Sequence, residues 1–214
     1  MIEVFGRPTS SNVQIVMWAI AELDLPYLRH DIGHNFGGNQ TDEFRAMNPN
    51  GLVPVIRDDQ RTVFESAAIL RYLAAAYGSD NFYPRNAGMR AELDMWAEWI
   101  KTTFTPIVLG RLFYPLVRRD PALIDQNAIS AAANDLKPLI MMLERRIGDG
   151  PYLGGDDISF ADIMIGHLLF RYYVLDFEKI EAPAVWDYYQ RLCARPAYQK
   201  HIMVDFESLR WGSE

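Results

Sequence analysis

Residues 48–73, NPNGLVPVIRDDQRTVFESAAILRYL, decide how the first part of the chain folds. Two short apolar runs, residues 53–56 and 62–64, flank a charged turn, which is a pattern typical of a β-hairpin. Glu65 and Ser66 then open a segment whose apolar residues recur at helical spacing. The stretch therefore predicts two adjacent strands followed directly by a helix.

The segments before this stretch predict two further strands, each followed by a helix. A strand over residues 2–5 precedes a helix over 13–23, a strand over 28–32, and a short helix around Phe44 and Met47. The resulting order is β-α-β-α-β-β-α, which implies a small mixed sheet with helices packed against it. We therefore expect the first part of the chain to be an α/β domain.

The apolar pattern changes after the hairpin. Apolar residues keep helical spacing from about residue 88 onward, and no convincing strand pattern occurs after Phe64. Residues 78–85, GSDNFYPR, are typical of a linker. We expect an α/β domain over residues 1–80 and an all-helical domain over residues 88–214.

One helix start in the second domain is clearly marked. Residues 157–163, DISFADI, place Ser159 at the N-cap position and Asp162 three residues later, with isoleucines on both sides as an apolar pair. The pattern predicts a capping box that nucleates a core helix, and we assign it no chemistry.

The composition excludes several classes of protein and site. The 214 residues include 21 Lys and Arg against 28 Asp and Glu, a formal net charge of −7, and half of the residues are hydrophobic. This balance argues against general binding to nucleic acid or to an anionic membrane. The single cysteine, Cys193, cannot form an internal disulfide or a thiolate zinc site, and the four histidines lack metal-ligand spacing, so no metal is expected. No signal peptide or membrane span is recognisable, so we expect a cytoplasmic protein.

A polar turn between the first strand and the first helix is the first candidate for chemistry. It contains Thr9, Ser10, Ser11 and Asn12. Hydroxyl groups in this position most often serve as helix N-caps. They can also act together with free amide groups at the helix start to stabilise a negative charge such as a thiolate. Both interpretations stay open at this point.

Two other positions can bind parts of a ligand. Pro54 heads a strand and lacks a ladder donor, which suits an edge or a bend. An ordinary trans bond is the commoner case, but a cis Val53–Pro54 bond would turn the Val53 backbone outward, where it could pair with an extended peptide. Ser66 is a plausible helix N-cap, and the amide groups just beyond it could bind a carboxylate.

These motifs occur in an order that resembles one known family. The stretches GRPTSSNVQ at residues 6–14, NPNGLVPVI at 48–56, ESAAILRYL at 65–73 and DDISFADI at 156–163 resemble cytosolic glutathione S-transferases of the serine type, theta-like or related bacterial members. The resemblance covers essentially the whole chain. It implies a thioredoxin-like N-terminal domain, a helical C-terminal domain, a homodimer, and a detoxifying transferase that conjugates glutathione to small hydrophobic electrophiles.

The resemblance implies a site for the glutathione thiol at the polar turn. Ser10 matches the serine whose hydroxyl stabilises the thiolate, although a register slip would substitute Ser11 or Asn12. A free thiol has a pKa of about 8.5, so only a small fraction is ionised at neutral pH without such help. Serine would therefore act as a hydrogen-bond donor and not as a nucleophile.

The resemblance also implies contacts for the rest of glutathione. Val53 would hold the cysteinyl backbone, with Pro54 in the cis form, while Glu65 and Ser66 would hold the γ-glutamyl end. Leu52 stands where related sequences often carry a lysine near the glycyl carboxylate. The glycine-rich loop offers other polar candidates for that end, namely His34, Asn39 and Gln40.

We expect the helical domain to supply most of the electrophile pocket. Its candidate walls and anion-binding residues are Phe104, Leu109, Phe113, Tyr114, Arg111 and Arg118, with Trp211 either capping the pocket or docked on the surface. Aromatic residues at helical spacing more often belong to a core, and we favour that interpretation for Trp96 and Phe104. Cys193 is expected to be buried and inert.

Two alternatives to a conjugating transferase stay open. One is a glutathione-dependent isomerase, dehalogenase or peroxidase on the same scaffold, because these differ only in the second pocket. The other is a non-catalytic interaction module, which the loss of lysine at Leu52 mildly favours. The intact polar turn and the Glu65–Ser66 pair count against that second alternative.

Overall fold

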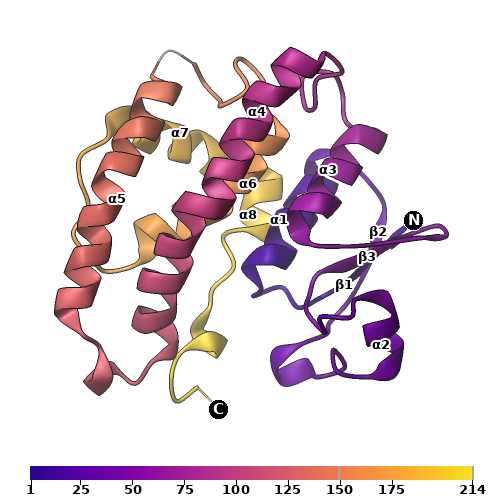
Figure 1. Cartoon of the computed structure of the whole chain (residues 1–214), viewed down its shortest axis with the longest axis horizontal. Coiled ribbons are helices and arrows are strands. Elements are labelled where there is room, and N and C mark those ends of the chain that lie inside the picture. The colour runs from indigo at the N-terminus through magenta and orange to yellow at the C-terminus, as the bar shows by residue number, and fades with distance from the viewer. Residues whose placement is uncertain (149, 214) are drawn as a thin grey trace.

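The computed structural model describes residues 1–148 and 150–213, and it divides visibly into a sheet region and a helical region (Figure 1). The sheet has four strands in the order β2-β1-β3-β4. The strands are β1 (Ile2–Phe5), β2 (Tyr27–His30), β3 (Val55–Asp58) and β4 (Arg61–Phe64). β1 is parallel to β2 and antiparallel to β3, and β3 is antiparallel to β4. The expected element order and the hairpin are therefore confirmed.

Helices cover both faces of this sheet. They are α1 (Ser11–Glu22), α2 (Asp42–Met47) and α3 (Ser66–Tyr77), with a short 3-10 turn, η1 (His34–Phe36), in the glycine-rich loop. Phe5 and Val55 alternate along their strands with Val4 and Ile56, so they point to the opposite face. Phe44 of α2 packs with Phe5 and Val55, whereas Val4 and Ile56 belong to the larger core that includes α1 and α3.

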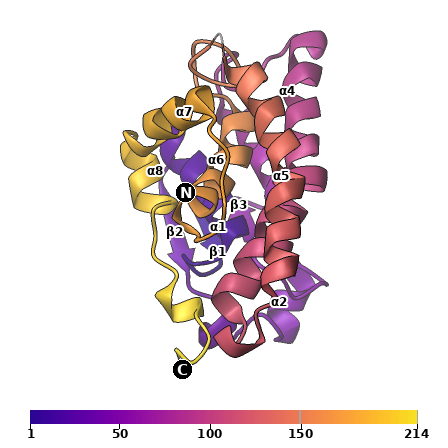
Figure 2. The same ribbon diagram turned by 90° about the vertical axis from the view of Figure 1, so that its left-hand side faces the viewer.

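The rest of the described chain is helical apart from one isolated bridge, with no strand after Phe64. Its longer elements are α4 (Ala87–Trp99), two π-helical stretches η2 (Ile100–Phe104) and η3 (Pro106–Arg118), α5 (Gln126–Ile147), α6 (Phe160–Val174), α7 (Pro183–Cys193) and α8 (Pro196–His201). Short 3-10 turns are η4 (Pro121–Leu123) and η5 (Glu207–Leu209). Figure 2 shows α6 in the middle of this region, between α4 and α5 on one side and α7 and α8 on the other.

Helix α6 begins where the sequence predicts. The Ser159 amide donates to the Asp162 carboxylate at 2.7 Å, and the capping box is formed. Every residue of α6 from Phe160 to Tyr172 is buried, as expected for a helix that is apolar on all sides. The capping box therefore starts the central helix of the core.

Helix α1 joins the two regions. Its residues from Val13 to Ile20 are all buried, and it packs against α3 on one side and α6 and α8 on the other. The Trp18 ring lies against Gly166 of α6 and edge-on to Tyr198 of α8. The Tyr198 hydroxyl donates to the Gly166 carbonyl at 2.7 Å. This contact fixes the position of α1 relative to the helical region.

The closeness of Trp18 to α6 leads to a stability prediction. A Cβ at Gly166 would lie 2.5 Å from a Trp18 ring atom, too close without a shift of packed groups. Gly166→Ala should therefore lower the free energy of unfolding by about 1–3 kcal/mol, as expected of an overpacked core. Urea denaturation measures the change.

Gly110→Ala in η3 is the matched control, because a Cβ there would meet nothing within 4 Å. It should leave the free energy of unfolding unchanged or raise it by up to about 1 kcal/mol. Equal destabilisation by both substitutions would contradict the packing described for Trp18.

Candidate active site

The start of α1 presents a serine that does not cap its helix. Ser10 occupies the N-cap position with an extended backbone, is 8% exposed, and makes no side-chain capping hydrogen bond. Its backbone is held by the Arg7 carbonyl on one side and the Gln14 amide on the other. The first-turn amide groups of α1 thus keep hydrogen-bonding capacity, and the hydroxyl remains available beside them.

The start of α3 lies next to the start of α1. The Ser66 hydroxyl donates to the Asn12 side-chain oxygen at 3.2 Å. Glu65, the residue before α3, has φ of 67° and its side chain does not cap the helix; it lies 3.8 Å from the Lys101 ammonium group. Two helix N-termini therefore meet at this point, and both favour negative charge nearby.

Val53 lies beside the same turn. The Val53–Pro54 peptide bond is cis, which confirms that part of the expectation, and the strand begins only at Val55. A Cβ at Gly6 would lie 3.3 Å from the Val53 Cβ atom, and one at Gly33 would lie 3.5 Å from a Val53 methyl group. Val53 is thus enclosed by the turn after β1 and the glycine-rich loop.

A small cavity of about 70 Å³ opens beside Ser10. Its lining comes from the turn after β1, from η3, from α6 and from η5: Arg7, Thr9, Ser10, Ser11, Asn12, Leu109, Phe113, Tyr114, Arg118, Arg171 and Leu209. A larger cavity of about 480 Å³ shares Arg118 and Leu209 with it and also includes His34 and Trp211. The polar turn therefore faces a space closed largely by the helical region.

The η3 segment supplies one wall of the small cavity. Leu109, Phe113 and Arg118 are four and five residues apart, close to one turn of a π-helix, whose hydrogen bonds run from residue i to i+5. They therefore fall on one face and point to the same side, together with Tyr114. The Arg118 guanidinium carbon lies 5.2 Å from the centre of the Tyr114 ring.

Three arginines converge on the small cavity from different elements. Arg7 follows β1, Arg118 ends η3, and Arg171 lies in α6. Burial, followed by the charge of Arg118, lowers the pKa of Arg7. Burial lowers the pKa of Arg171, which is 2% exposed, to about 10. The polar turn therefore lies in a strongly positive environment.

Gln14 connects Arg171 to the polar turn. Its side-chain oxygen accepts a hydrogen bond from Arg171 at 2.8 Å, and its amide nitrogen donates to the Pro8 carbonyl at 3.1 Å. Arg171 also donates to the His167 carbonyl at 2.9 Å. These bonds fix a buried cation of the helical region against the loop that carries Ser10.

The glycine-rich loop is tied to the segment that precedes Val53. Asn39 and Gln40 both donate to the Gly51 carbonyl, at 2.8 and 3.3 Å, and Arg45 donates to the Gln40 oxygen. His34 lines the larger cavity. Leu52 is 61% exposed. Of the loop candidates, His34 faces a cavity, while Asn39 and Gln40 serve the loop's own structure.

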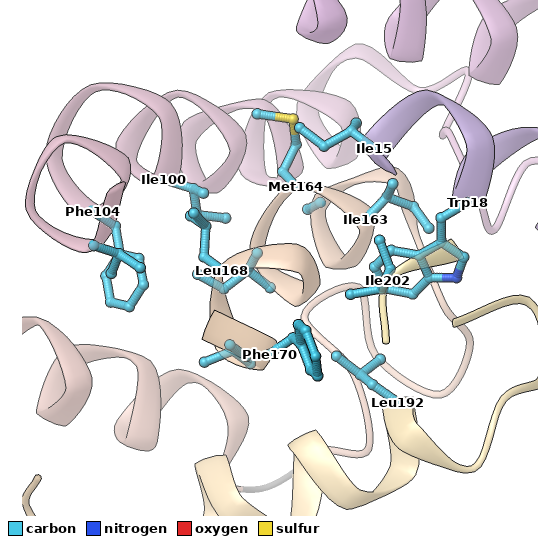
Figure 3. Close-up of a cluster of buried hydrophobic side chains, with 14 of the residues drawn as sticks. Ile15, Trp18, Ile100, Phe104, Ile163, Met164, Leu168, Phe170, Leu192 and Ile202 are labelled. Atoms are coloured by element: carbon cyan, nitrogen blue, oxygen red, sulfur yellow. The ribbon is translucent and has the colours of Figure 1, made fainter. Parts of the chain in front are cut away.

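Two expected pocket residues lie elsewhere. Phe104 is fully buried among Ile100, Leu168 and their neighbours (Figure 3), so its ring belongs to the core and not to the cavity wall. Arg111 is exposed and pairs with Asp135 of α5 at 2.7 Å. Tyr114 does line the small cavity. Phe104 in η2 therefore has the core role favoured for it and is no pocket residue, and Arg111 in η3 points toward α5 and not into the cavity.

The sequence interpretation missed Arg7, Gln14 and Arg171. Arg171 had a usable signal, because it is the only charged residue between Asp162 and Val174 in an otherwise apolar helix. Arg7 stands directly in the quoted turn, but nothing in the sequence indicates which way its side chain points.

Other features carry no chemistry at this site. Cys193 is half-buried and not fully buried as expected, and the burial that it has raises the pKa of its thiol. Among residues 1–148 and 150–213, no group of three or more His, Cys, Asp or Glu side chains is arranged to hold a metal ion. Nor does any helix in these residues combine the length and apolar character required to cross a bilayer.

Comparisons with known proteins place this geometry in a family. Sequence patterns described as "Glutathione S-transferase, N-terminal domain" and "Glutathione S-transferase, C-terminal domain" match residues 9–76 and 126–191. Glutathione S-transferase GstB of Escherichia coli strain K12 is 36% identical over 206 residues, which cover 95% of this chain and 99% of that protein.

Solved structures agree with the sequence match. A theta class glutathione S-transferase from Xanthomonas axonopodis pv. citri, crystallised with glutathione bound, has a TM-score of 0.89 and 36% identity, covering 95% of this chain and 98% of that one. A poplar glutathione transferase has a TM-score of 0.81 and 26% identity, covering 94% and 96%. The expected pairing of a thioredoxin-like domain with a helical domain is confirmed, and the chain belongs to the glutathione S-transferase family.

Proposed function

We propose that this chain activates the thiol of glutathione at the start of α1 and transfers the sulfur to small, largely apolar electrophiles. The observation that carries the proposal is the Ser10 hydroxyl, which stands at the N-cap of a buried helix without capping it. A hydroxyl in this position can donate to a thiolate, and the helix N-terminus favours the charged form. Arg7 and Arg171 add positive charge around the same cavity.

The other parts of glutathione have partners along one edge of the site. The cysteinyl backbone pairs with Val53, which lies between the first turn and the glycine-rich loop. The γ-glutamyl carboxylate binds at the start of α3, at Ser66 and the amides after it, and its ammonium group faces Glu65. Because Leu52 replaces the usual lysine, we assign the glycyl end to His34 and to the second amide hydrogen of Gln40, since the first bonds to the Gly51 carbonyl.

The electrophile sits between the polar turn and η3. Leu109, Phe113 and Tyr114 provide an apolar wall, and Trp211 extends it in the larger cavity. The thiolate forms a bond to the electrophilic carbon while the leaving group departs with its electron pair. Holding both reactants in one cavity supplies much of the acceleration.

Removal of the Ser10 hydroxyl tests this proposal. Ser10→Ala should lower kcat/KM for conjugation of 1-chloro-2,4-dinitrobenzene about 100-fold at neutral pH, as expected when one donor to a developing or bound anion is lost. The pKa of bound glutathione, followed by thiolate absorbance, should rise because the hydrogen bond favours the charged form. Affinity for glutathione should stay nearly unchanged.

Ser11→Ala and Asn12→Ala are the matched controls, since both residues line the same cavity. Each should affect the thiol pKa less than Ser10→Ala does. A larger effect from either substitution would identify Ser11 or Asn12, and not Ser10, as the hydrogen-bond donor to the thiolate.

The Ser66 side chain should matter for binding more than for turnover. Ser66→Ala removes a donor at the start of α3 and its hydrogen bond to Asn12, so the Kd for glutathione should rise about tenfold. The kcat at saturating glutathione should change little. Calorimetric titration measures the Kd, with Ser130→Ala on the exposed face of α5 as the control. An unchanged Kd would remove Ser66 from the site.

We also propose a cytoplasmic homodimer. Large apolar side chains are exposed on the consecutive helices α3 and α4, among them Tyr77, Met89 and Met95, as expected of a surface that a second copy covers. Sedimentation velocity should give twice the chain mass of 24.6 kDa at micromolar concentration. A monomer under these conditions would contradict the dimer but not the chemistry.

A further inference from the structure

Within residues 1–148 and 150–213, no acidic side chain forms an ion pair with the three arginines of the small cavity. The residues that line the cavity include neither Asp nor Glu. Among the described residues, Arg7, Arg118 and Arg171 each keep a buried Nε atom without a hydrogen-bond partner. Arg171 is only 2% exposed, so at least one of these unsatisfied donors lies deep in the protein. Buried cations of this kind are costly unless an anion accompanies them.

Two half-buried arginines elsewhere in the protein have carboxylate partners. Arg71 is paired with Asp94 and Glu98, and Arg195 is paired with Glu22. The groups that act on Arg7 and Arg171 are instead tyrosines and Arg118, which repels both. The cluster is distinguished by three arginines with buried, unbonded Nε atoms around one cavity, and it is therefore a positive site.

One thiolate does not match the charge of this cluster. The glutathione sulfur brings a single negative charge to a cavity with three guanidinium groups. Arg118 also lines the larger cavity, where the body of an electrophile has room, so its guanidinium group reaches both spaces. A second anion bound at Arg118 would lie next to the thiolate, and the arginines would offset the repulsion between the two negative charges.

We infer that the electrophiles preferred by this enzyme carry a compact anionic group, such as a carboxylate, held by Arg118 and Arg7 beside the thiolate. Arg171 positions this site through its hydrogen bonds to Gln14 and the His167 carbonyl. Tyr114 supports Arg118 through its ring. The inference rests on the proposed function, because it specifies the second substrate of the same reaction.

Two electrophiles that differ in charge test the inference. 4-Chloro-3-nitrobenzoate and 4-chloro-3-nitrobenzamide share the ring, the nitro group and the leaving group. In both, the thiolate adds to the carbon that bears chlorine, chloride leaves with its electron pair, and the thiol proton passes to solvent. Each kcat/KM is measured with saturating glutathione at low salt and divided by the uncatalysed rate constant of the same compound.

The native enzyme should favour the benzoate over the benzamide about tenfold or more on this normalised scale, and the preference should shrink as salt is added. Arg118→Met removes the charge while keeping an unbranched apolar side chain, so the benzoate-to-benzamide ratio should fall about tenfold. Arg118→Lys should give a benzoate-to-benzamide ratio between those of Arg118→Met and the native enzyme. Lysine keeps the positive charge but lacks the planar guanidinium group that can donate two hydrogen bonds to one carboxylate.

Arg145→Met, an exposed arginine of α5, is the control and should keep the native ratio. A native ratio near one, or a ratio that Arg118→Met leaves intact, overturns the inference while the transferase activity stands. If the native enzyme conjugates neither compound nor 1-chloro-2,4-dinitrobenzene, the proposed function fails and the inference fails with it.

Discussion

The burial of helix α1 between the sheet and the helical region is the constraint on which the site depends. Residues from Val13 to Ile20 contact core on every side, and Trp18 against Gly166 fixes the helix along its axis. The N-terminus of α1 therefore has one position relative to both regions. Because Ser10 sits at that N-terminus, core packing on one side of the molecule determines where its hydroxyl points.

Polar bonds then connect the two regions at the site itself. Gln14, one turn after Ser10, accepts from Arg171 of α6 and donates to the loop carbonyl of Pro8. A buried side chain with all of these contacts satisfied resists displacement. The turn that carries Ser10 is consequently held from the helical region as well as from its own sheet, which suits a group that must meet a bound thiolate in one geometry.

The fold and several residues of the cavity, namely Leu109, Phe113, Tyr114 and Arg118, were predictable from the sequence, whereas Arg7 and Arg171 were not. The hairpin, the Ser159 capping box and the change to helical spacing each rest on local patterns, and the structure contains all three. Ser10 and Ser66 were identifiable because they start helices. Phe104 and Arg111 were candidates for the pocket, with a core role favoured for Phe104, and the π-helical stretches η2 and η3 place Phe104 in the core and Arg111 toward α5.

Convergence between distant segments is the reason that Arg7 and Arg171 escaped prediction, although Arg118 did not. Arg7 and Arg171 are separated by most of the chain, and only the packing of α1 against α6 brings them to one cavity. No local sequence pattern indicates that Arg7 and Arg171 line the same cavity.

The Trp211 indole, which is 60% exposed and lines the larger cavity, is an intrinsic fluorescence probe of that cavity. Its amide donates to the Val117 carbonyl at 2.9 Å, next to Arg118, so the ring is anchored where the second substrate would enter. Trp18, in contrast, is sealed in the core. A nitroaromatic occupant of the larger cavity would quench the emission of Trp211 more than that of the buried Trp18, so a fall in tryptophan fluorescence would report that this cavity is occupied.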